Sequence, residues 1–201
     1  MSRPDKLPKF LSEDAQKRLF AEPNPRYFSP HRDLLLMRVM REAGLRVSEA
    51  VSLKPEHVDM RNCRVTVREG KGAKDRLTYI SSGLRDEIAE WIDRRDEEAE
   101  GTEWLFPTKK GTKVDPNHLR RSVKRYAEKA GIDEVERVSP HTLRHTFATA
   151  HYRQHGDIRR LQKLLGHSDI STTMIYTHMA DEELEEGARE SAEAFAEEIM
   201  G

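Results

Sequence analysis

The segment over residues 30–43 constrains the fold more than any other part of this sequence. If the segment is helical, it presents one broad apolar face, made of Leu34, Leu35, Met37, Val39 and Met40. Ser29 and Pro30 are residue types that commonly begin a helix, and Gly44 is the type that commonly ends one. We therefore predict a helix over this segment that lies at the centre of a hydrophobic core, with other elements packed around it.

Cap residues predict helices along most of the remaining chain. Serine or aspartate, followed in some cases by proline, begins the expected helices at Ser12, Ser48, Ser82, Asp115, Ser139, Asp157 and Ser171. Residues 64–68 and 77–80 are instead rich in strand formers and flank a short turn with two glycines, Gly70 and Gly72. The predicted fold class is α+β and mainly α-helical, with one small antiparallel β-sheet.

The domain organisation follows from the length and from the charge of the last segment. A chain of 201 residues suits one domain with a self-sufficient core. We predict a leader at residues 1–10, one domain at residues 11–180, and an acidic amphipathic helix at residues 181–201. That last helix carries a narrow apolar stripe, which either packs on the chain's own core or binds a groove of a neighbouring protomer.

The net charge of −1 hides two oppositely charged parts of the chain. Residues 181–201 contain nine acidic residues and one arginine, a net charge of −8. Residues 1–180 therefore contain 34 basic and 27 acidic residues, a net charge of +7. A basic body favours a polyanionic partner, because each cation that neutralises a phosphate releases counterions. A solvated surface of mixed charge is the alternative interpretation.

Composition argues against two classes of protein. The single cysteine, Cys63, cannot form an internal disulfide, which indicates a reducing compartment. No apolar run approaches the roughly 20 residues that cross a bilayer, and residues 1–10 do not resemble a secretion signal. We therefore expect a soluble protein of the cytoplasm that has no membrane partner.

His141, Arg144 and His145 form the first candidate site. On a helix that begins at Pro140, these three side chains share one face near the amino-terminal end. Unpaired backbone N–H groups and the positive end of the helix dipole favour an anion there. The alternative is that both histidines are ordinary surface residues and that Arg144 forms a salt bridge.

Arg46 and Lys71 are further candidates for contacts with a phosphate. Arg46 lies in a tight connection three residues before Glu49, and a guanidinium offers two parallel donors that match two phosphate oxygens. The alternative is a simple salt bridge between Arg46 and Glu49. Lys71 lies between two glycines, so its backbone is permissive, although such a turn can also be a solvated hairpin tip.

Tyr176 is the candidate nucleophile, and it follows His167 by nine residues. A phenol with a pKa near 10 is a poor nucleophile at neutral pH. Neighbouring arginines or a base would favour the phenolate and make attack on a phosphate feasible. A tyrosine buried in the core is the alternative interpretation.

This chain resembles the tyrosine recombinases of the phage integrase family in segments 44–50, 141–149 and 164–178 and in its Gly-Lys-Gly turn. The resemblance covers the chain from about Leu11 to His178 and implies the catalytic-domain fold of that family. It implies a site-specific DNA recombinase whose scissile phosphate is surrounded by Arg46, Lys71, His141, Arg144 and His167, with Tyr176 as the nucleophile. The intermediate would be a 3′-phosphotyrosyl enzyme, formed without ATP, a metal ion or another cofactor.

The resemblance also implies a role for each of these residues. The two arginines and His167 stabilise the pentacoordinate phosphorus. Lys71 protonates the leaving 5′ oxygen, and His141 acts on the proton of the nucleophile. Glu49 and His145 match positions that support the site in the family.

Double-stranded DNA is the partner that the resemblance implies. Outside the catalytic set, the side chains expected to bind DNA are Lys74, Arg76, Arg120, Arg121 and Lys124. We also expect self-assembly into a dimer or tetramer on DNA, with the C-terminal helix and accessory DNA-binding proteins as candidate contacts. Most members of the family carry a further domain that clamps DNA before the catalytic domain. We therefore expect either a minimal recombinase or an excised catalytic domain.

Other functions remain open on the sequence alone. A type IB topoisomerase would use a similar site but rejoin the same strand, and a non-catalytic regulator derived from a recombinase would only bind DNA. A helical binding module with no nucleic-acid role is a third alternative. The pairs His141/His145 and His151/His155 have the spacing of zinc ligands on a helix, but no Glu follows the first His of the first pair and the single cysteine is distant. We therefore expect no metal site.

Overall fold

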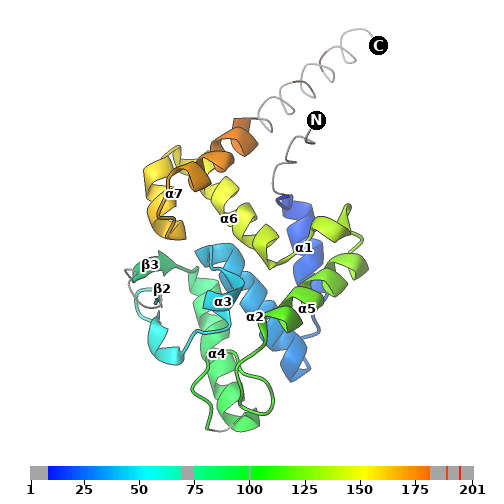
Figure 1. The fold of residues 1–201 in the computed structure, drawn as a ribbon. Helices are drawn as coiled ribbons and strands as arrows, with labels where there is room; N and C mark the ends of the chain where they lie inside the picture. The colour runs from blue at the N-terminus through cyan, green and yellow to red at the C-terminus, as the bar shows by residue number, and fades with distance from the viewer. Residues whose placement is uncertain (1–8, 69–74, 100, 182–188, 190–194, 196–201) are drawn as a thin grey trace. The chain divides into compact units, whose positions relative to one another are not determined.

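The computed structural model describes residues 9–68, 75–99, 101–181, 189 and 195 (Figure 1). The helices are α1 (Glu13–Ala21), α2 (Phe28–Ala43), α3 (Val47–Ala50), α4 (Ser82–Glu98), α5 (Pro116–Lys129), α6 (Pro140–His155) and α7 (Ile158–Leu165). The strands are β1 (Val58–Asp59), β2 (Arg64–Val67) and β3 (Arg76–Tyr79), and two 3₁₀ turns are η1 (Pro55–His57) and η2 (Val135–Arg137). The predicted fold class, mainly helical with one small antiparallel sheet, is confirmed.

The described residues fall into two compact units, divided within α6 between Phe147 and Ala148. The predicted domain boundaries stay predictions, because most of residues 1–10 and 181–201 lie outside the described part of the chain. Within that part, no helix combines the length and the apolar character needed to span a bilayer.

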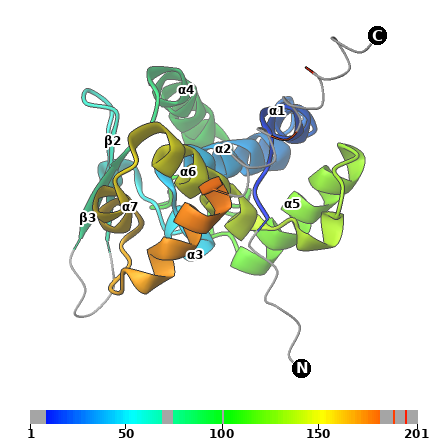
Figure 2. The same cartoon turned by 90° about the horizontal axis from the view of Figure 1, so that it is seen from above.

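Helix α2 organises the first unit, as the sequence predicts. It contacts α1, α3, α4, α5 and β3, and both ribbon views show it between α1 and α4 (Figures 1 and 2). Of the predicted apolar face, Leu34 is partly exposed, and the other members are buried: Leu35, Met37, Val39 and Met40. Leu36, which was not predicted to belong to this face, is buried as well. Burial of this broad face accounts for the central position of the helix, since each fully buried Leu or Met contributes about 1.5 to 3 kcal/mol.

The helix ends agree with the predicted caps at some positions and differ at others. Ser12 and Asp115 are the N-caps of α1 and α5, and each accepts a hydrogen bond from a backbone N–H of the first turn. Helix α2 begins at Phe28, earlier than the Ser29-Pro30 signal. Helix α3 begins at Val47 rather than after Ser48. One cause of the last shift is the carboxylate of residue 49, which reaches back to the N-cap backbone, as described below.

The sheet has three antiparallel strands in the order β1-β2-β3 within the described residues. The predicted hairpin is confirmed, and its register pairs Val67 with Arg76. Strand β1 was not predicted, because two residues are too few to show a period of two. Strand β3 turns Arg76 and Thr78 inward and leaves Leu77 and Tyr79 exposed. Its inner face is therefore polar, and the Thr78 hydroxyl donates to the carbonyl of Ala43 at 2.9 Å.

The second unit continues α6 and adds α7 and a helical segment over residues 171–181. Asp157 caps α7, as predicted, by accepting from the backbone N–H of Arg160 at 2.9 Å. Gly166 ends α7 in the left-handed conformation with φ of 66°. Ser171 is the first helical residue of the next segment, and Asp169 instead accepts its backbone N–H at 2.9 Å.

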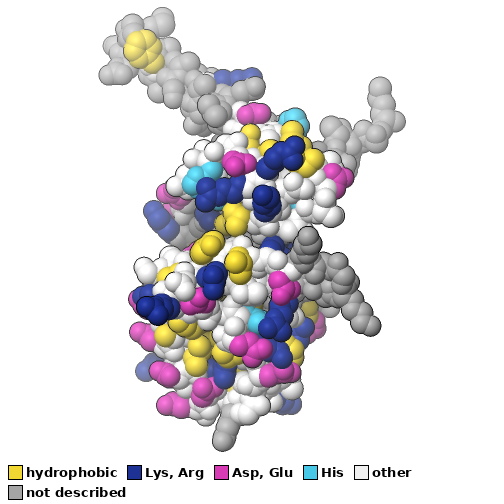
Figure 3. Space-filling model, turned by 90° about the vertical axis from the view of Figure 1, so that its left-hand side faces the viewer, with side chains coloured by type: hydrophobic (Ala, Val, Ile, Leu, Met, Phe, Trp, Pro, Cys, Tyr) yellow, Lys and Arg dark blue, Asp and Glu magenta, His cyan; other side chains and the backbone are white. Residues whose placement is uncertain are grey.

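The molecular surface is mixed in charge on the face that Figure 3 displays. Lysine and arginine side chains there alternate with aspartate and glutamate, and hydrophobic side chains lie between them. A single continuous basic surface does not cover this face. On this face, contacts with a polyanion would therefore depend on particular residues rather than on one basic surface.

Gly44 is the position at which a small substitution should disturb the first unit most. Its φ of 65° lies in the left-handed region, and an added Cβ would lie 2.4 Å from Cδ1 of Phe147. We expect Gly44→Ala to lower the free energy of unfolding by about 2 to 4 kcal/mol, because backbone strain and overpacking combine. Denaturant unfolding measures the change.

Gly131→Ala is the matched control for this substitution. Gly131 also has a positive φ, of 60°, but its added Cβ would meet only the end of the Arg18 side chain, at 3.7 Å. We expect a loss of about 1 kcal/mol, from backbone strain alone. Equal losses for the two variants would show that the contact of Gly44 with Phe147 has no energetic weight.

Candidate active site

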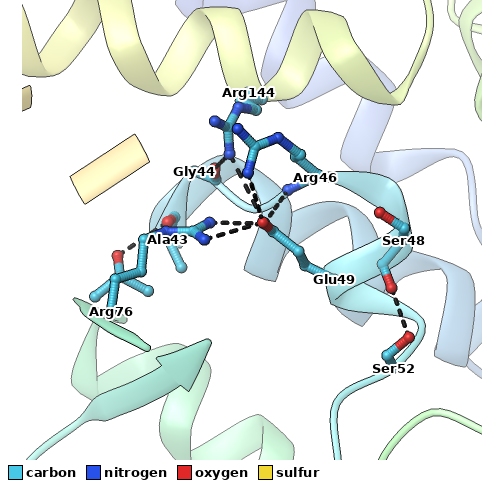
Figure 4. Close-up of polar contacts among 9 residues, drawn as sticks. Ala43, Gly44, Arg46, Ser48, Glu49, Ser52, Arg76 and Arg144 are labelled. Carbon is cyan, nitrogen blue, oxygen red and sulfur yellow. Dashed lines mark hydrogen bonds and ion pairs between the residues drawn. The ribbon is translucent and has the colours of Figure 1, made fainter. Parts of the chain in front are cut away.

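Glu49 is the centre of a cluster of arginines in the first unit (Figure 4). The backbone N–H of Arg46 donates to Oε2 at 2.7 Å, and Nη1 of Arg46 donates to Oε1 at 2.9 Å. The guanidinium of Arg76 donates to both oxygens, from Nη1 to Oε1 at 2.9 Å and from Nη2 to Oε2 at 2.7 Å. The carboxylate of Glu49, whose side chain is 10% exposed, is thus held from α3 and from β3.

Arg144 reaches the same carboxylate from α6. Its Nη1 donates to the carbonyl oxygen of Gly44 at 2.6 Å and lies 3.8 Å from Oε2 of Glu49. The side chain of Arg144 is 5% exposed, whereas that of Arg46 is 36% exposed. The fold therefore brings Arg46 and Arg144, which are far apart in the sequence, to one carboxylate, as Figure 4 shows.

The electrostatics of the cluster keep Glu49 ionised. Burial alone would raise the pKa of the Glu49 carboxyl, because it disfavours the charged form. The hydrogen bonds and positive charge of Arg76, and then the bonds from Arg46, outweigh burial and lower that pKa below its usual value. Glu49 therefore neutralises one positive charge of the cluster at neutral pH.

His141, Arg144 and His145 lie in the first turns of α6, where His141 is exposed, Arg144 is buried and His145 is partly buried. The pKa of His141 is lowered by its partial burial and by the charges of Arg120, Arg144 and Arg46. The pKa of His145 is lowered to about 4 by burial, by His141 and by Arg144. Both imidazoles are thus biased toward the neutral form, first by burial and then by neighbouring positive charge. The arginines among these neighbours make this part of the unit suited to an anion.

The lowered pKa of His145 predicts a pH dependence of stability. Between about pH 6.5 and 4 the unfolded chain binds a proton at His145 that the folded chain does not. The stability due to neutral His145 is therefore complete above pH 6.5 and is lost as the pH falls to 4. We expect a loss of about 2 to 3 kcal/mol over this range in the wild type. Chemical unfolding at several pH values should show a smaller loss in His145→Asn. If the free energy of unfolding fell equally with pH in the variant and the wild type, the lowered pKa of His145 would be contradicted.

The predicted DNA-binding residues are placed differently from one another. Arg120, Arg121 and Lys124 are exposed on α5, and Nη1 of Arg120 donates to Oδ1 of Asn117 at 2.6 Å. Arg76 is 7% exposed and is occupied by Glu49, so its position does not agree with the predicted DNA contact. The sequence did not predict this pairing, because the alternation in β3 favours Leu77 and Tyr79, not Arg76, as the inward side chains.

Two predicted residues, Lys71 and Lys74, lie outside the described residues. Their assignments to the catalytic set and to DNA binding stay predictions.

His167 and Tyr176 belong to the second unit. Nδ1 of His167 lies 3.0 Å from Oγ1 of Thr173, and the backbone N–H of His167 donates to the carbonyl of Gln162 at 3.1 Å. Thr173 is fully buried and lies one turn before Tyr176 on the helical segment 171–181. His167 is thereby fixed to the segment that carries the predicted nucleophile, and Tyr176 itself is 2% exposed.

Metal ligands are not grouped in the described part of the chain. No set of three or more His, Cys, Asp or Glu side chains is placed there so that it could hold a metal ion. The pair His151 and His155 has its ring centroids 4.5 Å apart, without a further ligand among those residue types.

Comparison with known proteins identifies the family. Residues 9–183 match the model of the phage integrase family. The tyrosine recombinase XerA of Thermococcus kodakarensis is 40% identical over 198 residues, which are 98% of this chain and 67% of that protein. The chain belongs to the phage integrase family.

Solved structures agree with this result. The crystal structure of XerA recombinase superposes with a TM-score of 0.79 and 34% identity over 94% of this chain and 66% of that one. A post-cleavage complex of the XerH site-specific recombinase with its palindromic difH substrate superposes with a TM-score of 0.78. Its sequence identity is 30%, and the match covers 92% of this chain and 53% of that one. The fold is therefore that of tyrosine recombinases. The chain spans about two thirds or less of the length of these proteins.

Proposed function

We propose that this chain performs the strand cleavage and rejoining of a site-specific DNA recombinase. The observation that carries the proposal is the convergence of Arg46 and Arg144 on Glu49 from α3 and α6. Glu49 neutralises about one of these charges, and Arg76 supplies a third guanidinium to the same carboxylate. The cluster therefore retains positive charge with which to bind a phosphate and stabilise the charge that develops on it.

The chemical step is an attack by the Tyr176 hydroxyl on a phosphodiester. The bond from the tyrosine oxygen to phosphorus forms while the bond from phosphorus to the 5′ oxygen breaks. His141, which its lowered pKa keeps neutral, takes the phenolic proton, and Lys71 protonates the leaving 5′ oxygen. Arg46, Arg144 and His167 stabilise the phosphorane, and reversal with another 5′ hydroxyl rejoins the strand.

This step requires a change in the surroundings of Tyr176. With 2% of the residue exposed, DNA binding must make its hydroxyl accessible. The helical segment 171–181 carries both Tyr176 and Thr173, so a shift of this segment would move the nucleophile together with the group that contacts His167.

The substrate of the proposed reaction is double-stranded DNA. XerH is a site-specific recombinase whose solved structure contains its DNA substrate, and it is 30% identical to this chain. Arg120, Arg121 and Lys124 are exposed on α5 and are proposed to contact the DNA backbone, with Lys74. We further propose assembly of two or four protomers on DNA through residues 181–201, accessory DNA-binding proteins as partners, and action in the cytoplasm.

Covalent trapping tests the proposed function. A pool of end-labelled duplexes, nicked near a randomised central sequence, loses a short fragment after cleavage and so cannot rejoin. We expect a labelled protein–DNA adduct that resists detergent and forms without ATP or a divalent cation. Binding of the pool without any adduct would contradict the proposal and would favour a non-catalytic regulator.

A second assay separates recombination from strand relaxation. Duplexes recovered from the adduct can be placed twice on one plasmid, and we expect exchange between the two copies. Relaxation without exchange would favour the topoisomerase alternative, which has no support in the comparisons with known proteins.

A further inference from the structure

Arg76 makes contacts that neither the proposed mechanism nor a role in DNA binding explains. It is the first residue of β3, and its guanidinium is almost wholly buried against Glu49. The two bonds, of 2.9 and 2.7 Å, form a bidentate pair, which is the strongest geometry available to an arginine and a carboxylate. The pair uses two of the five N–H donors of the guanidinium, and the 7% exposure of the side chain shields it from a DNA backbone.

The pair changes what Glu49 can do to the other arginines. Glu49 also accepts from Arg46, and it lies 3.8 Å from Arg144. Without Arg76, the carboxylate would keep its full charge for these two guanidiniums and would compete with a phosphate for them. With Arg76 in place, the Arg76–Glu49 pair is formally neutral, and Arg46 and Arg144 retain their positive charge for a ligand.

The pair also fixes the orientation of the carboxylate. Arg76 binds both oxygens from the sheet, and Arg46 binds both from the N-cap of α3. Strand β3 is itself attached to the end of α2, because the Thr78 hydroxyl donates to the Ala43 carbonyl. The position of Arg46 thus depends on a chain of contacts that begins in the sheet.

We propose that Arg76 is a positioning residue, which orients and neutralises Glu49 so that Arg46 and Arg144 are available to the scissile phosphate. This inference rests on the proposed function, since it assigns Arg76 to the same site. It replaces the predicted contact between Arg76 and DNA. In this role Arg76 contacts neither DNA nor the reacting atoms and acts through Glu49.

The test separates the rate of cleavage from the affinity for DNA. Arg76→Met keeps the length of the side chain and removes its charge, and Arg76→Lys keeps the charge and removes the bidentate pair. We expect Arg76→Met to cleave a saturating nicked duplex about 10- to 100-fold more slowly, as is typical when a supporting partner is lost. The dissociation constant and its dependence on salt should stay near the wild-type values, and Arg76→Lys should recover part of the rate.

The opposite pattern would overturn the proposal. Replacing a residue that contacts phosphate directly would weaken binding to all DNA sequences. It would also reduce by about 1 the slope of the logarithm of the binding constant against the logarithm of the salt concentration. If Arg76→Met cleaved saturating DNA at the wild-type rate but bound DNA more weakly in this way, Arg76 would be a DNA-binding residue, as predicted from the sequence. Wild-type protein that forms no adduct would instead refute the proposed function, so the two failures are distinguishable.

Two further variants exclude a general loss of structure. Arg64→Met on the neighbouring strand removes an exposed ion pair with Asp59, whose Nη2 to Oδ2 distance is 3.0 Å, and should leave the rate unchanged. In a double-mutant cycle, Arg76→Met should have little further effect once Glu49→Gln is present, because both act through one carboxylate. Additive losses of cleavage rate in the double variant would contradict this expectation. The rate of Arg76→Lys is measured below its unfolding temperature, so that the fold is intact.

Discussion

Replacing Arg144 with alanine is expected to slow strand cleavage by about 10²-fold or more. Arg144 is 5% exposed and is held by the Gly44 carbonyl at 2.6 Å, so its guanidinium is oriented before any substrate binds. A preorganised donor that stabilises developing charge in a site shielded from water contributes about this much to a rate. The measurement is the single-turnover rate of adduct formation on a nicked duplex.

Two variants control for this prediction. Arg137→Ala removes an arginine that forms an ion pair with Glu134 at 2.9 Å, outside the cluster, and should change the rate by less than a few-fold. Arg144→Lys keeps a charge that can reach the cluster but loses the planar fork, so we expect an intermediate rate and a folded protein. Activity of Arg144→Ala within a few-fold of the wild type would remove Arg144 from the site.

Replacing Tyr176 with phenylalanine is expected to abolish adduct formation entirely. The change removes a single oxygen, which is the atom that the proposed reaction joins to phosphorus. The aromatic ring remains, so a residue that is 2% exposed keeps its packing and the helical segment 171–181 should stay folded. DNA binding should therefore persist while the covalent product disappears.

Tyr152→Phe is the matched control for the nucleophile. Tyr152 lies on α6, outside the helical segment 171–181 that carries Tyr176 and Thr173. This variant should form the adduct at the wild-type rate. An adduct that persists in Tyr176→Phe would show that another residue attacks the phosphate.

The helical part of the fold was predictable because its signals are local. The apolar face of α2 and the caps Ser12, Asp115 and Asp157 each act within one or two turns of a helix. Strand β1 was not predicted, since its two residues pair with β2 only through tertiary contacts. The start of α3 differs from the prediction because the later side chain of Glu49 takes part in its cap, whereas α2 starts at Phe28 without a side-chain cap.

Some contacts of the candidate site could be predicted from the sequence, and others could not. Arg46 and Glu49 are three residues apart, so their salt bridge could be inferred from spacing. The contact between Arg76 and Glu49 could not be inferred in this way, because the two residues are 27 positions apart in the sequence. Strand β3 faces inward with Arg76 and Thr78, contrary to the expectation that apolar side chains point to the core. The inner face is polar there because it meets the Glu49 carboxylate and the Ala43 carbonyl.

Mapping the covalent bond tests the central claim most directly. The adduct formed by the wild-type chain can be digested with a protease and a nuclease, and the peptide that retains a nucleotide can be sequenced by mass spectrometry. We expect a 3′-linked nucleotide on the side chain of Tyr176, and its loss in Arg144→Ala at matched reaction times. A nucleotide on any other residue, or a cleaved strand with no protein attached, would contradict the account.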